Sequence, residues 1–117
     1  MSKIKIKTTI NDEHFYCEGI KNKNNIIYKD NNVSVKIIFS DIIKIIRENS
    51  EYKIELNFNK NEKTKINYLL KEYNKSLELN LITKNININN NYIEILYEII
   101  DNNEGNINFK LEFEEIL

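Results

Sequence analysis

Residues 52–58 read YKIELNF, and along this stretch apolar and polar side chains alternate with a period of two. The same alternation runs through residues 3–10, 93–99 and 107–113. A period of two places successive side chains on opposite faces of an extended strand. Clusters of asparagine separate the apolar runs, and asparagine tolerates the left-handed backbone of tight turns. The pattern therefore predicts a β-meander.

The alternating runs set the expected strands. They lie at residues 3–10, 14–20, 25–30, 33–39, 42–48, 51–58, 63–70, 76–83, 86–88 with 92–100, and 106–114. The strongest helical rival is 42–47, where isoleucines would form one stripe. That segment is short and rich in β-branched side chains, which favour strands. We therefore expect an all-β fold.

Each expected strand has one apolar face, which must be buried. Because no amphipathic helix is available to cover it, the sheet must pack as a sandwich or close on itself. Short turns between successive strands favour an antiparallel up-and-down meander closed into a β-barrel of about eight to ten strands. The side chains predicted to point inward are Ile4, Ile6, Phe15, Cys17, Tyr28, Val33, Val35, Ile37, Phe39, Tyr52, Ile54, Leu56, Phe58, Ile66, Tyr68, Leu77, Leu79, Leu81, Ile93, Ile95, Tyr97, Ile99, Ile107, Phe109, Leu111 and Phe113.

One place breaks the alternation. Inward positions are odd-numbered at Leu77, Leu79, Leu81 and Thr83, whereas the next isoleucines, Ile86 and Ile88, are even-numbered. A β-bulge or sharp bend near Lys84 and Asn85 would restore the phase, and barrels commonly use such irregularities to turn a corner.

Composition limits the possible partners and locations. The 117 residues are the size of one domain, and we expect a single domain over 1–117. Lys and Arg number 17 against 18 Asp and Glu, so no net charge favours nucleic acid or an anionic membrane, and neither is expected as a partner. The single cysteine, Cys17, fits a reducing compartment. Residues 1–10 lack the continuous apolar core of a secretory signal or membrane span, so the cytoplasm is the expected location.

Several strands and turns together resemble a known family. They are Ile45-Ile46-Arg47 before a turn, the strand of Tyr68, the connection before Leu77-Glu78-Leu79, Thr83-Lys84 with Ile86 and Ile88, Tyr97-Glu98, and, near the N-terminus, Ile4-Lys5-Ile6 and Glu18-Gly19. This order resembles the YwiB-like family, small bacterial proteins with a calycin-type barrel and no established function. Residues 71–76 depart from the proline and glycine turn that the family usually has. The resemblance implies a calycin- or lipocalin-like barrel, and it does not imply a function.

Catalytic chemistry is not predicted. His14 and Cys17 are three residues apart on one strand, so their side chains should point to opposite faces and a Cys-His dyad should not form. A single histidine and a single cysteine also exclude the usual zinc clusters. Asp101 and Glu104 precede Gly105, and a hairpin turn accounts for them better than a calcium loop does. We expect no enzyme activity, no cofactor and no metal.

The outward side chains of the expected strands are mostly charged. The Lys3, Lys5 and Lys7 comb suits an exposed strand that needs protection from edge pairing. Glu residues at 94, 98, 112 and 114 have outward parity, so they read as a solvated face rather than as acid and base groups in a dry cleft.

The most informative polar side chains have inward parity. They are Tyr28, Tyr52, Tyr68, Tyr97 and the only arginine, Arg47, which shares its parity with isoleucines 43 and 45. In one interpretation they form a structural network that closes the barrel end, with the guanidinium satisfied by a carboxylate or by backbone carbonyls. In the other they are the polar end of a cavity that holds a small anionic or amphipathic ligand. Because the expected interior is crowded with large side chains, a filled core is the preferred expectation.

Two hypotheses for function follow. The first is a non-enzymatic barrel that binds a small-molecule ligand at the Arg47 end. The second is an interaction module or homodimer that associates through a strand edge or an outer apolar patch. Outward-parity candidates for that patch are Ile38, Ile82, Leu96 and Ile100.

Overall fold

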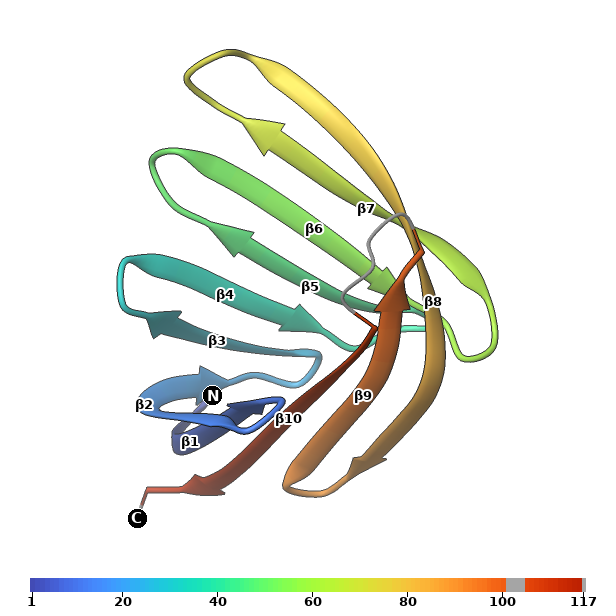
Figure 1. Cartoon of the computed structure of the whole chain (residues 1–117). Coiled ribbons are helices and arrows are strands. Elements are labelled where there is room, and N and C mark those ends of the chain that lie inside the picture. The colour runs from blue at the N-terminus through green and yellow to red at the C-terminus, as the bar shows by residue number, and fades with distance from the viewer. Residues whose placement is uncertain (101–104, 117) are drawn as a thin grey trace.

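The computed structural model describes residues 1–100 and 105–116, and within them the chain forms ten strands (Figure 1). The strands are β1 (Ser2–Ile10), β2 (Glu13–Lys21), β3 (Asn25–Asp30), β4 (Val33–Ile38), β5 (Ile43–Glu48), β6 (Tyr52–Phe58), β7 (Lys63–Leu70), β8 (Lys75–Asn89), β9 (Tyr92–Ile99) and β10 (Asn106–Glu115). No helix that could cross a membrane occurs in this part of the chain. Residues 43–47 lie in β5, so this segment is a strand and not a helix, as expected.

Every strand pairs antiparallel with the next, and β10 pairs with β1 to close the barrel. The all-β, up-and-down barrel is therefore confirmed. Turn residues Asn11, Asn31, Asn61 and Asn74 all have positive φ, between 47° and 64°. Asparagine therefore does supply the left-handed backbone of these turns, although of the four residues only Asn31 belongs to an asparagine cluster.

The long curved strand β8 runs from the top of Figure 1 down its right side and contains the predicted irregularity. Its register against β9 shifts between Thr83 and Asn85, which confirms a bulge there. The expected grouping of residues 86–88 with 92–100 is wrong, because 86–88 continue β8 and the turn to β9 lies at Asn90 and Asn91. The bulge changes the phase of the strand without ending its pairing.

The buried side chains form one apolar cluster in the barrel interior. Its members are Ile4, Ile6, Ile26, Tyr28, Val35, Ile37, Ile43, Ile45, Leu56, Phe58, Ile66, Leu81, Ile93, Ile95, Phe109, Leu111 and Phe113. Most belong to the predicted inward set. Ile26, Ile43 and Ile45 were absent from that set, although Ile43 and Ile45 share the parity of Arg47, which was predicted to point inward.

Two residues predicted to point into the core are exposed. Phe15 is 39% exposed and Leu77 is 52% exposed. Each lies on a part of its strand that has a partner on one side only. On β2, only residues 19–21 pair with β3, so Phe15 lies outside that pairing. On β8, pairing with β9 begins at Leu81, so Leu77 lies outside it. Inward parity therefore does not bury these side chains, because no adjacent strand covers them.

Candidate functional site

A cavity of about 420 Å³ lies inside the barrel, at the end where β5 finishes. Its walls are mainly aliphatic and aromatic side chains from strands around the barrel. The lining residues are Ile10, Tyr28, Ile45, Arg47, Ile54, Leu56, Phe58, Ile66, Tyr68, Leu79, Tyr97, Ile99 and Phe109. The expectation of a filled interior is wrong at this end. Isoleucine and leucine side chains from opposite sides of a ten-stranded barrel do not reach far enough to fill it.

Arg47 supplies the positive charge of this cavity. It follows the inward-facing Ile43 and Ile45 on β5, and its side chain is 26% exposed. One Nη2–H donates to Oδ2 of Asp30 at 3.2 Å. A guanidinium carries five N–H donors, and within residues 1–100 and 105–116 this is the one hydrogen bond that the Arg47 side chain makes.

Asp30 was not among the predicted site residues. It is the last residue of β3 and follows Tyr28 by two positions, so it has the same inward parity as Tyr28. In the register of β4, Asp30 is opposite Val33 and Arg47 is opposite Val35. The two charged side chains therefore face the same side of the sheet across β4. The parity of Asp30 was the signal that would have identified it.

Three of the four predicted tyrosines, Tyr28, Tyr68 and Tyr97, line the cavity together with Arg47. Tyr52 does not line it, but its ring lies 6.0 Å from that of Tyr68 and supports it. The ring of Tyr97 packs edge-on against Phe58 with 4.9 Å between centroids. The phenols are thus held by packing around the cavity.

Burial keeps the phenols of Tyr28 and Tyr97 neutral. Burial raises the pKa of Tyr28 and of Tyr97, and the nearby positive charge of Arg47 opposes part of that rise. Neither shift arises from a hydrogen bond to the phenol. At neutral pH both hydroxyls are therefore O–H groups that can donate to an acceptor in the cavity.

The structure gives His14 and Cys17 different surroundings. His14 is exposed, and its Nδ1 lies 2.9 Å from Oγ1 of Thr9. Cys17 is half-buried against the core, where burial and the negative charge of Asp30 raise the pKa of its thiol. A thiol with a raised pKa is a poor nucleophile at neutral pH.

Metal-ligand chemistry has no cluster to use in residues 1–100 and 105–116. No three histidine, cysteine, aspartate or glutamate side chains gather there in a way that would hold an ion. Asp101 and Glu104, considered above for calcium, lie outside the described residues.

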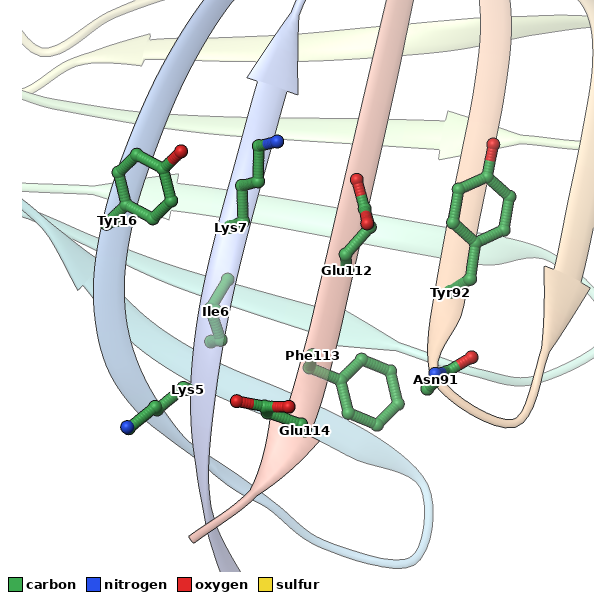
Figure 2. Close-up of a pocket in the computed structure, with 9 residues that line it drawn as sticks. All are labelled: Lys5, Ile6, Lys7, Tyr16, Asn91, Tyr92, Glu112, Phe113 and Glu114. Atoms are coloured by element: carbon green, nitrogen blue, oxygen red, sulfur yellow. The ribbon is translucent and has the colours of Figure 1, made fainter.

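A second hollow, of about 380 Å³, lies on the outer face of the barrel (Figure 2). Figure 2 shows Tyr16, Lys7, Glu112 and Tyr92 in one row across β2, β1, β10 and β9, and the strand register makes them direct cross-strand neighbours. Lys7 Nζ lies 6.0 Å from the centre of the Tyr16 ring.

Tyr92 at the other end of this row is also paired. Its hydroxyl donates to Glu94 at 2.7 Å, and this bond raises the pKa of Tyr92 to about 12 and lowers the pKa of Glu94. The lining of the outer hollow thus carries charges of both signs, from Lys5, Lys7, Glu112 and Glu114, beside few apolar side chains. The barrel cavity, with its apolar walls and single guanidinium, is the stronger candidate for a ligand site.

Comparison with known proteins adds one finding. No protein-family model matches the chain, and no curated protein matches it. Among solved structures, the fold is similar to that of the ywiB protein from Bacillus subtilis, with a TM-score of 0.67 and 18% sequence identity. The chain has the YwiB fold.

The match to YwiB covers 98% of this chain and 91% of the other. The resemblance to the YwiB-like family is therefore confirmed at the level of the fold. At this identity the match concerns architecture, and the function has to be argued from the cavity itself.

Proposed function

We propose that this protein is a non-enzymatic, calycin-like barrel that binds one small amphipathic ligand in the cavity at the Arg47 end. The apolar chain of the ligand lies between the aliphatic walls, and an anionic head group meets the guanidinium. The observation that carries the proposal is the placement of the only arginine, beside three tyrosines, at a cavity whose other lining residues are aliphatic or phenylalanine. A volume of about 420 Å³ falls within the range of small-molecule sites.

The charges favour a monoanionic head group. Asp30 already neutralises part of the Arg47 charge, so a second anion gains less there than it would beside an unpaired arginine. The neutral hydroxyls of Tyr28 and Tyr97 add hydrogen-bond donors without adding charge. A carboxylate fits this set of groups better than a doubly charged phosphate does.

A pair of probes tests the proposal. Decanoate and decan-1-ol share an apolar chain and differ in the charge of the head group, and each can be measured by its displacement of an environment-sensitive naphthalene sulfonate dye. We expect both to bind, decanoate more tightly. Arg47→Gln should lower the affinity for decanoate by about tenfold, because a charged hydrogen bond is worth about 1.5–3 kcal/mol. It should hardly change the affinity for decan-1-ol.

Lys44→Gln is the matched control, because Lys44 lies on the same strand but pairs with Glu55 on the outer face. It should leave both affinities unchanged. The proposal is refuted if Arg47→Gln and Lys44→Gln lose the same amount of affinity for decanoate. It is also refuted if neither probe shows saturable binding to the wild type.

A further inference from the structure

The barrel is closed, but β2 keeps one free edge. Along its whole length β2 pairs with β1, whereas β3 pairs only with Gly19, Ile20 and Lys21. Among the described residues, no strand pairs with the second edge of residues 13–18. The backbone N–H and C=O groups that point out from such an edge can pair with another extended chain.

The free edge lacks the usual protection. Residues 14–18 read HFYCE and contain no lysine, proline or glycine. Tyr16 at the centre is 74% exposed and Phe15 beside it is 39% exposed. Edge strands that stay unpaired usually carry lysine, proline or a bulge, and this segment instead exposes two aromatic rings.

The sequence of this edge is complementary to itself. If two copies pair antiparallel about a two-fold axis at Tyr16, Tyr16 meets Tyr16, Phe15 meets Cys17 and His14 meets Glu18. Strand alternation places the tyrosine and the His14–Glu18 pairs on the outer face, and the Phe15–Cys17 pairs on the inner face. Tyr16 lies on the outer face in Figure 2. Each contact joins chemically matched groups, aromatic with aromatic, apolar with thiol and imidazole with carboxylate.

Neighbouring registers are worse. A shift by two residues in one direction places Asp12 opposite Glu18, two like charges. The opposite shift needs the edge of Gly19, which already pairs with Tyr28 of β3. The register centred on Tyr16 uses the free segment and stops where β3 begins to pair.

His14 has one ring nitrogen available for this contact. Its Nδ1 shares a hydrogen bond with Oγ1 of Thr9 on β1, which leaves Nε2 for a carboxylate of the second copy.

The free edge and the barrel cavity are separate sites, because none of the five residues from 14 to 18 lines the cavity.

We infer that the free edge of β2 pairs with the same edge of a second copy and forms a two-fold symmetric dimer. The two sheets become continuous through residues 14–18. A five-residue pairing buries little surface, so the dimer belongs to the weak, concentration-dependent class of assemblies.

Sedimentation equilibrium from micromolar to millimolar concentration tests this inference. We expect the mass to rise from the 14.0 kDa of one chain towards twice that value. Tyr16→Glu places two like charges together at the axis and should raise the dissociation constant at least tenfold. His14→Glu should do the same, and adding Glu18→Lys should restore dimerisation, because the swapped charges attract again.

Cross-linking fixes the register. Directly opposite residues in an antiparallel pair have Cα atoms about 4.5–5.5 Å apart, which suits a disulfide. In a Cys17→Ser background, Tyr16→Cys should therefore oxidise to a covalent dimer. Tyr73→Cys, at a similarly exposed position in the β7–β8 turn, is the control and should oxidise much more slowly.

Three outcomes would overturn the inference: a wild-type monomer at millimolar concentration, a dimer that Tyr16→Glu does not weaken, or equal oxidation of the two cysteine variants. Ligand binding by the same variants reports separately on the cavity. Loss of the dimer with retained decanoate binding would support both the inference and the proposed function.

Discussion

Arg47 and Asp30 form an ion pair that spans β4, with Nη2 and Oδ2 3.2 Å apart. The pair joins the ends of β5 and β3 on the inner side of the sheet. Both side chains are less exposed than Lys44 and Glu55, which form an ion pair on the outer face. The same contact therefore has two roles to test, one in stability and one at the cavity.

Arg47→Ala should lower the free energy of unfolding by about 1–3 kcal/mol, because it leaves the carboxylate of Asp30 partly buried without its partner. Urea midpoints measure the change, and a double-mutant cycle with Asp30→Ala isolates the coupling. Lys44→Ala breaks a more exposed pair and should cost at most about 1 kcal/mol. An unchanged midpoint for Arg47→Ala would show that the pair adds nothing to stability.

Leu79→Phe should reduce ligand binding, because Leu79 lines the cavity and a larger ring would occupy it. The volume that the added atoms take from a ligand corresponds to an affinity loss of about tenfold or more for decanoate. Ile82→Phe is a matched change at a half-buried position of the same strand that does not line the cavity. If both variants bind decanoate equally well, the ligand does not occupy this cavity.

The Tyr92–Glu94 hydrogen bond should make stability depend on pH at both extremes. The bond lowers the pKa of Glu94 from 4.5, so its contribution is present above pH 4.5 and is lost as the pH falls through the lowered value. The bond also raises the pKa of Tyr92 from 10.0 to about 12, so its contribution is present below pH 10 and is lost as the pH rises through about 12.

Glu94→Gln should bring the pKa of Tyr92 back towards 10, and NMR titration of the tyrosine ring carbons measures it. Lys110→Gln keeps the bond and serves as the control. A Tyr92 pKa that stays near 12 in Glu94→Gln would mean that the carboxylate is not its cause.

Gly19→Ala should destabilise the protein by about 1–3 kcal/mol, through overpacking. A Cβ at this position would lie 2.7 Å from the carbonyl oxygen of Ile27 and 2.7 Å from Cδ1 of Ile6. The oxygen belongs to the backbone, so it cannot move without shifting β3. Thermal or urea denaturation measures the loss.

Gly105→Ala provides the contrast. Its φ of 78° disfavours alanine, but no atom of residues 1–100 or 105–116 lies within 4 Å of the added Cβ. It should cost about 1 kcal/mol from backbone conformation alone. A loss for Gly19→Ala no larger than that for Gly105→Ala would argue against the steric explanation.

Alternation carried most of the fold prediction. It located the strands, the bulge at Thr83 to Asn85 and the inward direction of Arg47, because side-chain parity is a property of the strand alone. It also predicted correctly that the isoleucines of 42–47 belong to a strand. These features need no knowledge of which strands extend past their neighbours.

The sequence-based predictions were wrong where burial depends on how the strands are arranged in three dimensions. Phe15 and Leu77 have inward parity but lie beyond the ends of β3 and β9, and relative strand length is not written in the alternation. The cavity depends on the distance across the closed barrel, which the residue types alone do not give. The inward parity of Asp30 could have identified it, but a single aspartate at the end of a strand resembles a turn residue.

The pairing of β1 with β10 has a consequence for folding kinetics. Ile4 lies opposite Glu115, so the last seam of the sheet joins segments from far apart in the sequence. Contacts of such long range form slowly, because the loop between them must first be ordered. Until β10 arrives, β1 presents an unpaired edge of its own. The positive charges of Lys3, Lys5 and Lys7 would then repel other incompletely folded chains until β1 and β10 have paired.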